Sequence, residues 1–266
     1  MLTPASAATQ AGGSVPNEDY YLVAESWALV LDGVTRYPDD GCVHDVPWYV
    51  AALGAALAGR FTTGDQDLRS VLAEAIAVVA TLHGDSCDLS NPVSPAATVA
   101  IVRARGGRFQ WLVLGDCAIA WREPGSPPQV ESDDRLARLT DPPAVVDVGG
   151  LRRYSVEYID RVRNRPNGFW VASADPHAAR EARTGDAPLA DIDTACLFTD
   201  GLTRLAERYG RTWEQILDLA ETEGIPALIE AVRREERDDP RLLRKAKRHD
   251  DATGVLLRPG AVTDPA

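Results

Sequence analysis

Two apolar runs that each end in an Asp-Gly pair constrain the fold of this chain more than any other feature. The runs are WALVLDG at residues 27–33 and ACLFTDG at residues 195–201. Each has the length and composition of a buried β-strand. Each run therefore places a carboxylate, Asp32 or Asp200, at a strand end. That position is costly for a carboxylate unless water, a cation or hydrogen-bond donors meet it.

Two further acidic positions border apolar runs. Asp19 precedes the run YYLVA, and Asp250 opens the segment DDATGVLL. Carboxylate oxygens in this number suit Mg²⁺ or Mn²⁺, whereas a zinc centre would call for a His/Cys cluster that the sequence pattern does not offer. The sequence therefore predicts a hard-metal site built from oxygen ligands.

Length and composition limit the classes of protein that fit. The 266 residues are enough for one large domain, and the net charge of −12 argues against binding to nucleic acid or to anionic membranes. No apolar stretch approaches the roughly 18 residues of a membrane helix, and the first residues lack the regions of a secretory signal. The cysteines at 42, 87, 117 and 196 form no CxxC pair. We expect a cytoplasmic protein with reduced structural thiols rather than a zinc site or disulfides.

The order of periodic segments predicts an α+β fold. We expect a flexible lead at 1–13, one domain at 14–257 and a polar tail at 258–266, with little periodicity in 124–149. The expected strands are 20–24, 27–32, 96–104, 108–116, 117–123, 168–175 and 254–257. The expected helices are 47–61, 67–84, 202–208, 212–222 and 225–238.

Six short motifs occur in an order that resembles a known family. They are Asn17-Glu18-Asp19, Asp32-Gly33-Val34, Ala97-Thr98-Val99, Gly115-Asp116-Cys117, Thr199-Asp200-Gly201-Leu202 and Asp250-Asp251-Ala252-Thr253. The ordered set resembles the metal-dependent protein phosphatases of the PPM/PP2C type, and the bacterial branch in particular. The resemblance spans residues 14–257.

This resemblance implies an αββα four-layer sandwich, in which two antiparallel sheets are flanked by helix pairs. The helices at 47–61 and 67–84 would cover one sheet, and those at 202–238 the other. The implied activity is hydrolysis of phosphoserine or phosphothreonine in proteins by a water that bridges two Mn²⁺ or Mg²⁺ ions. The implied partner is a phosphorylated protein in a bacterial signalling pathway.

The resemblance also implies a role for each acidic residue. Asp32 would bridge both metals, the Gly33 carbonyl would hold the second, and Asp200 and Asp250 would complete the first. Asp32, Asp200 and Asp250 are therefore the implied catalytic residues. Glu18 and Asp19 would act through waters in the outer shell, and Asp116 would serve a possible third metal.

The sequence departs from the family pattern at several functional positions, among them Val34, where some members carry a His that acts as a general acid. Family members often carry a phosphate-binding arginine before the Glu-Asp motif, but no Lys or Arg precedes Arg36. Arg36, Arg163 and Arg165 are the candidates to replace it. Arg204 stands where some members carry a third-metal aspartate. These departures keep two alternatives open, a pseudophosphatase that binds a regulatory partner and a small-molecule phosphohydrolase with the same site.

Overall fold

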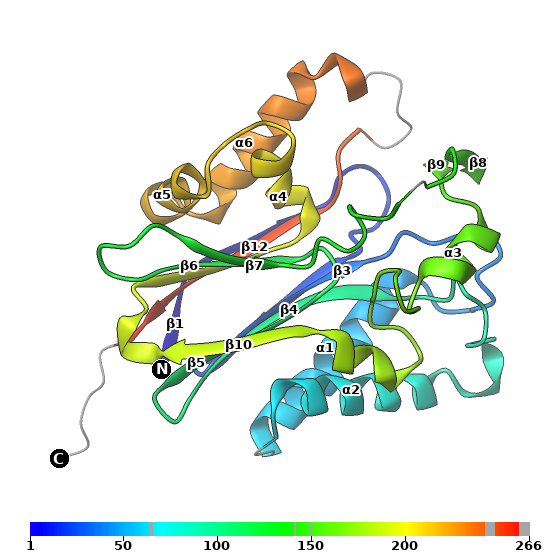
Figure 1. Ribbon diagram of the computed structural model, residues 1–266, viewed down its shortest axis with the longest axis horizontal. Helices are drawn as coiled ribbons and strands as arrows, with labels where there is room; N and C mark the ends of the chain where they lie inside the picture. The colour runs from blue at the N-terminus through cyan, green and yellow to red at the C-terminus, as the bar shows by residue number, and fades with distance from the viewer. Residues whose placement is uncertain (64–65, 141, 149–150, 243–247, 261–266) are drawn as a thin grey trace.

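In the computed structural model, two five-stranded antiparallel sheets face each other and helices cover their outer faces (Figure 1). The structure describes residues 1–63, 66–140, 142–148, 151–242 and 248–260. The first sheet has the order β1 (Leu2–Gln10), β12 (Ala252–Pro259), β11 (Thr194–Phe198), β6 (Ala118–Arg122), β7 (Gln129–Ser132). The second has the order β10 (Arg183–Pro188), β5 (Arg108–Leu114), β4 (Ala97–Arg105), β3 (Trp27–Gly33), β2 (Asp19–Val23). This architecture confirms the predicted α+β sandwich.

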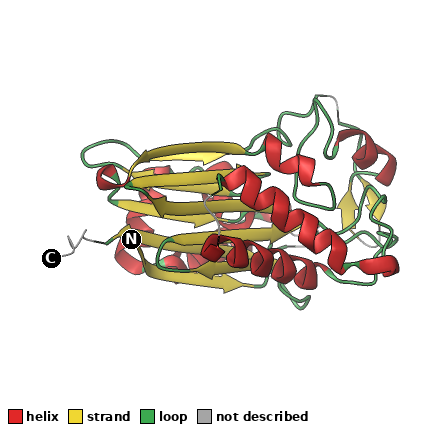
Figure 2. Cartoon of the chain, turned by 90° about the horizontal axis from the view of Figure 1, so that it is seen from below, coloured by secondary structure: helices red, strands yellow, loops and turns green. Residues whose placement is uncertain are grey.

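The central strands β3 and β4 of the second sheet are buried on both faces, which explains their continuous apolar runs. In β3, Leu29 and Leu31 point outward into the core beneath helices α1 (Val46–Thr63) and α2 (Leu68–Leu82). Ala28 and Val30 point inward, into the core between the two sheets. Figure 2 views the molecule from the side of these helices, which lie across the strands.

Three later helices cover the first sheet. They are α4 (Asp200–Glu207), α5 (Trp213–Glu223) and α6 (Ile225–Asp238). Phe198 of β11 and Leu256 of β12 pack against them in a separate core cluster. A capping box between Thr212 and Gln215 begins α5. The predicted coverage of each sheet by its own helices is thus confirmed.

The remaining elements are short and mostly lie between β6 and β11. They are η1 (Gly84–Ser86), β8 (Val146–Val148), β9 (Leu151–Arg153), α3 (Val156–Val162), η2 (Pro176–Glu181), η3 (Leu189–Asp191) and η4 (Pro240–Leu242).

The expectation of a flexible lead at 1–13 is wrong, because residues 2–10 form edge strand β1. This strand pairs antiparallel with β12 along its whole length. The Thr9 and Thr253 hydroxyls share a hydrogen bond of 2.6 Å, and the Ser6 hydroxyl accepts the Ile225 N–H at 3.0 Å. Small polar residues on an edge strand form the same ladder without the apolar run that reveals a central strand.

The strand predicted at 168–175 does not form. Phe169, Trp170 and Val171 are buried, but as a loop in which only Ala172 pairs with the sheet, at Ala97. The Phe169 N–H is bonded instead to the Val162 carbonyl at the end of α3, at 2.9 Å. At the C-terminal end, β12 runs to Pro259, so the tail expected from 258 begins later, and residues 261–266 lie outside the described residues.

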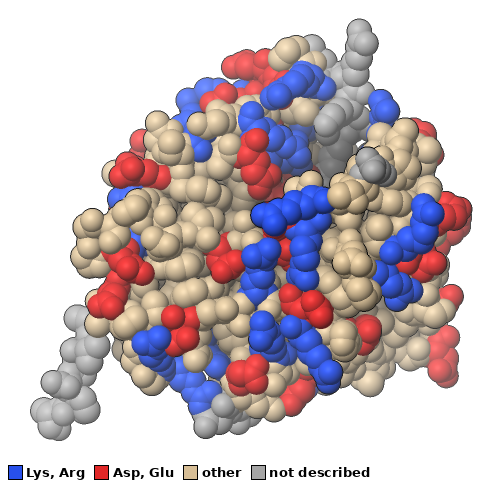
Figure 3. All heavy atoms as spheres, in the orientation of Figure 1, with Lys and Arg blue, Asp and Glu red and all other residues tan. Residues whose placement is uncertain are grey.

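On one face of the molecule, charged side chains of both signs are interspersed (Figure 3). Basic side chains on the face in Figure 3 lie beside acidic ones rather than forming a broad basic patch. Within the described part of the chain, no helix combines the length and apolarity that crossing a bilayer requires.

Candidate metal centre

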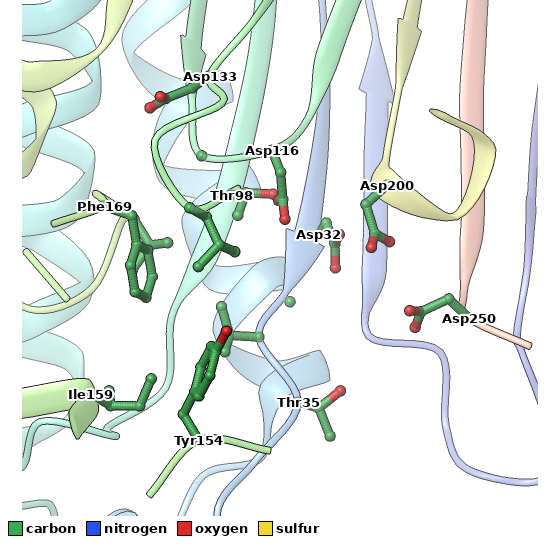
Figure 4. A pocket seen from close by; sticks show the side chains of 15 residues that line it. Asp32, Thr35, Thr98, Asp116, Asp133, Tyr154, Ile159, Phe169, Asp200 and Asp250 are labelled. Atoms are coloured by element: carbon green, nitrogen blue, oxygen red, sulfur yellow. The ribbon is translucent and has the colours of Figure 1, made fainter. Parts of the chain in front are cut away.

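Four aspartates from four segments meet at one end of the sandwich. Asp32 is near the end of β3, Asp116 follows β5, Asp200 is the first residue of α4, and Asp250 precedes β12. Together with Gly33 they line a cavity of about 270 Å³. Figure 4 shows the carboxylates of Asp32, Asp200 and Asp250 directed into a shared space, with Asp116 beside them. The structure thus brings together the implied metal ligands.

Strand pairing sets these positions. Asp32 is opposite Asp19 on β2 and opposite Thr98 on β4. The Gly33 N–H donates to the Glu18 carbonyl at 3.0 Å, which continues the pairing beyond Asp32. Because the backbone is held from both sides, the Asp32 carboxylate has little freedom to move away from its neighbours.

The glycine of each Asp-Gly pair is required by close packing. A Cβ at Gly33 would lie 2.2 Å from Val46 Cγ1 and 2.6 Å from the Glu18 carbonyl oxygen. A Cβ at Gly201 would lie 1.9 Å from the Asp251 carbonyl oxygen. Any side chain at either site would therefore displace the backbone that carries the carboxylates.

The electrostatics of the cavity call for a cation. Burial, reinforced by the neighbouring carboxylates, raises the pKa of Asp32 well above its usual range. Burial, then Asp250, raise the pKa of Asp200 to about 8, and burial raises that of Asp19 to about 7. Among the described residues, Oδ1 of Asp19 and Oδ1 of Asp116 are buried without a hydrogen-bond partner. This all-oxygen donor set fits a hard divalent cation.

Hydroxyls and backbone N–H groups hold the surrounding acidic side chains. The Thr199 hydroxyl donates to Asp19 Oδ2 at 2.8 Å, and the Thr35 hydroxyl donates to Glu18 Oε2 at 2.8 Å. Glu18 lines a neighbouring cavity rather than the aspartate cavity.

Sequence reasoning missed the part played by Asp251. This carboxylate accepts the N–H groups of Gly12 and Glu18 at 2.7 and 2.8 Å. It thereby fixes the segment between β1 and β2. In the sequence, only the acidic pair at 250–251 pointed to Asp251. The pair did not show that Asp250 faces the cavity while Asp251 binds backbone N–H groups.

Arg204 supplies a cation from within the protein itself. Its guanidinium pairs with Asp250 and lies 3.7 Å from Asp200. It also pairs with the fully buried Glu236 at 3.0 Å, and Glu236 in turn meets Arg233 at 2.9 Å and the His249 ring at 2.7 Å. The residue that stands where an aspartate was expected therefore contacts two of the implied metal ligands.

The three candidate phosphate-binding arginines lie elsewhere. Arg36 pairs with Asp40 at 2.6 Å. Arg163 is buried and donates to the Ser94 carbonyl at 2.8 Å, and Arg165 is 3.6 Å from Asp160. No Lys or Arg is among the described residues that line the aspartate cavity.

The opposite wall of the cavity is mostly apolar, although its segment also supplies Asp133, which pairs with Arg135. The segment between β6 and β10 supplies Leu136, Tyr154, Ile159, Phe169 and Val171. In Figure 4, Tyr154, Ile159 and Phe169 stand across the cavity from the aspartates. The site therefore joins a cluster of carboxylates to a hydrophobic surface.

Solved structures with the same fold are numerous, although their sequences are distant. A C. elegans sex determining protein superposes with a TM-score of 0.59 at 14% identity over 98% of this chain, which spans 65% of that protein. The serine/threonine phosphatase PstP/Ppp of Mycobacterium tuberculosis gives 0.61 at 15%, covering 97% of this chain and 98% of that one. The catalytic domain of PstP in complex with two manganese ions gives 0.59 at 14%, covering 97% of both chains.

At these identities the likeness establishes the fold alone. No curated protein sequence matches the chain significantly. The sequence profile of the family described as protein phosphatase 2C, however, matches residues 9–233, which is most of the chain. The chain therefore belongs to the protein phosphatase 2C family.

Proposed function

We propose that this protein is a metal-dependent phosphatase that hydrolyses phosphoserine and phosphothreonine in proteins. The observation that carries the proposal is the convergence of Asp32, Asp116, Asp200 and Asp250 on one cavity, with raised carboxyl pKa values that a bound cation would offset. The PstP complex with two manganese ions supports Mn²⁺, and Mg²⁺ has the same ligand preferences.

In this proposal the chain's own groups hold two ions. Asp32, the Gly33 carbonyl, Asp200 and Asp250 would hold the two ions. Asp116 would be available to a third, and Glu18 and Asp19 would act through waters. When bound, a pair of divalent cations acidifies a water and neutralises phosphoryl oxygens, so hydrolysis needs no cysteine or serine nucleophile.

The absence of basic residues among the described lining residues affects substrate binding. The phosphate charge would be met by the metal ions alone, so we expect a high KM. The apolar wall formed by Tyr154, Ile159 and Phe169 would bind an apolar side chain next to the phosphorylated residue. This favours phosphopeptides with apolar neighbours over highly charged nucleotides.

The test is hydrolysis of a phosphothreonine peptide with Mn²⁺, with EDTA, and by the variant Asp200→Asn. Asp186→Asn is the matched control, because Asp186 is an exposed aspartate of β10 that pairs with Arg108 of β5. We expect activity only with Mn²⁺, loss in Asp200→Asn, and no change in Asp186→Asn. Inactivity of the folded, manganese-loaded protein on phosphopeptides with apolar and with acidic neighbours would contradict the proposal. Turnover of nucleotides or sugar phosphates instead would indicate a small-molecule phosphohydrolase.

One observation favours a pseudophosphatase that binds a regulatory partner. Arg204 already neutralises part of the carboxylate cluster, through Asp250 and Asp200. If Arg204 takes the place of a metal, calorimetry will detect no Mn²⁺ binding. Binding of two Mn²⁺ ions would remove the basis for this alternative.

A further inference from the structure

A second cluster of metal-ligating side chains lies outside the aspartate cavity, between the segment that precedes α1 and the C-terminal end of α2. Cys42 is in the segment between β3 and α1, His83 is the C-cap of α2, and Cys87 follows η1. The Cys42 sulfur lies 3.3 Å from His83 Nδ1 and 2.6 Å from the Cys87 sulfur. All three ligand atoms lie within 4.8 Å of one another. None of the three residues lines the aspartate cavity.

The backbone around this cluster donates to both sulfurs. The Val43 N–H donates to Cys87 Sγ at 3.4 Å, and the His44 N–H donates to Cys42 Sγ at 3.4 Å. Such donors stabilise negative charge on sulfur, which is the form in which cysteine binds a metal. Cys42 and His83 are buried, with exposed fractions of 7% and 3%. Two of the three ligands are thus shielded from solvent, whereas Cys87 is partly exposed.

A fourth donor stands beside the three. The His44 ring stacks on Trp48 at a centroid distance of 3.8 Å and meets the His83 ring edge-on at 5.4 Å. As a fourth ligand, His44 would have to rotate its ring away from Trp48 and toward the cluster. Two cysteines and two histidines are a common ligand set for structural zinc.

We propose that Cys42, His83 and Cys87, with His44 in the fourth position, bind one Zn²⁺ ion. With Zn–S near 2.3 Å and Zn–N near 2.0–2.1 Å, neighbouring tetrahedral ligand atoms lie about 3.5 Å apart. The distance between Cys42 Sγ and His83 Nδ1 already fits. To bind zinc, the two sulfurs would have to move apart by about 1 Å. A small rotation of the partly exposed Cys87 side chain about χ1 would provide this movement.

The main competing chemistry is a disulfide between Cys42 and Cys87, because the same sulfurs are close enough to bond after a small movement. A disulfide, however, gives no role to the His83 nitrogen directed at Cys42, nor to the His44 ring. The zinc site accounts for both imidazoles and for the N–H donors to both sulfurs.

Zinc here would fasten the segment that leads from the aspartates to α1. Val34 and Thr35 line the aspartate cavity, and the same segment continues to Cys42. The buried Asp40 receives Arg36 and the Cys42 N–H within it. A metal that ties Cys42 to the end of α2 would anchor a stretch without regular secondary structure at its far end.

The experiment is titration of the full chain with Zn²⁺ and, separately, with Co²⁺ under reducing conditions. We expect one tightly bound zinc per chain by elemental analysis. Co²⁺ should give the strong visible bands of a tetrahedral site and a thiolate-to-cobalt charge-transfer band, which the oxygen ligands of the aspartate site cannot produce. The readout needs no phosphatase substrate, so it succeeds or fails independently of the proposed function.

Variants then assign the ligands. Cys42→Ser and Cys87→Ser should each lose the charge-transfer intensity of one sulfur and at least about tenfold in zinc affinity, and His44→Gln should lose affinity with both sulfur contributions kept. Cys196→Ala, in the core of β11, is the control and should behave as wild type. If the serine variants do not fold, protection of Cys42 and Cys87 from alkylation by Zn²⁺ in the wild-type chain provides the same assignment. Absence of the charge-transfer band, or a Cys42–Cys87 disulfide that persists with excess reductant and zinc, would overturn the proposal.

Discussion

The aspartate cavity and the Cys42–His83–Cys87 cluster are two ligand sets of opposite character, joined by one segment of chain. The first contains hard, mutually repelling carboxylate oxygens. Burial makes their ionised form less stable and so raises the pKa of Asp32 and Asp200. The second contains soft sulfur and nitrogen donors that already contact one another. A carboxylate cluster needs a cation to relieve repulsion, whereas a thiol–imidazole cluster is stable without one. Metal removal should therefore affect the two regions very differently.

The largest effect is expected for Asp32→Asn. Loss of the carboxylate shared by both proposed ions should lower phosphatase activity more than about 100-fold, because removal even of a supporting partner costs roughly 10–100-fold. In EDTA the same variant should melt at a higher temperature than wild type, since folding no longer has to bury or protonate the Asp32 carboxylate. Activity assays with Mn²⁺ and thermal denaturation in EDTA measure the two effects.

Asp186→Asn should change neither quantity. An Asp32→Asn variant that keeps its activity, or that is destabilised in EDTA, would show that Asp32 does not occupy a strained metal site.

Arg204→Met tests whether the guanidinium of Arg204 competes with Mn²⁺ in the aspartate cavity. Arg204 partly neutralises Asp200 and Asp250, so Mn²⁺ competes with it for these carboxylates. Removing the guanidinium should raise Mn²⁺ affinity about tenfold, or about 1.4 kcal/mol, as measured by calorimetry. Arg211→Met is the control, because Arg211 pairs with Glu235 at 3.2 Å and lies outside the cavity. Weaker Mn²⁺ binding would show instead that Arg204 positions the carboxylates for the metal.

How far the sequence could predict each region follows from this contrast. The aspartates stand at the ends of apolar runs, so local patterning placed Asp32 and Asp200 at strand termini, and the order of the motifs indicated that they meet. The cysteine–histidine cluster has no such signal, since 41 residues separate Cys42 from His83 and only the packing of α2 unites them. Edge strand β1 was missed for a related reason, because its small polar residues carry no apolar run.

The pH dependence of the metal-free protein tests the repulsion directly. The pKa of Asp200 is about 8 and that of Asp19 about 7 in the folded protein, against 3.8 for an ordinary aspartate. The folded state therefore holds more protons than the unfolded state between these values, and the free energy of unfolding should fall as pH rises toward 8. Thermal denaturation in EDTA between about pH 5 and pH 8 should show a falling Tm.

Saturating Mn²⁺ should flatten this slope, because bound metal holds the carboxylates ionised in the folded state. Asp200→Asn in EDTA should also reduce it. A metal-free Tm that is constant or rises over the same range would contradict the assigned electrostatics.

The smallest effect on catalysis is expected from the cysteine–histidine cluster. At a zinc concentration of 100 times Kd, binding should stabilise the protein by about 2.7 kcal/mol and raise Tm by about 5–10 °C. Cys87→Ala should abolish this rise.

Once excess zinc, which competes for the aspartates, has been removed, the Cys87→Ala variant should retain kcat within about threefold, because the cluster contributes no group to the cavity. A larger loss of kcat in Cys87→Ala would show coupling between the sites if zinc-free wild type has the same loss and one equivalent of zinc restores its kcat. The segment from Asp32 to Cys42 would then transmit the state of one site to the other. The two regions would then be a coupled pair rather than separate sites, since both lie at the ends of the same segment.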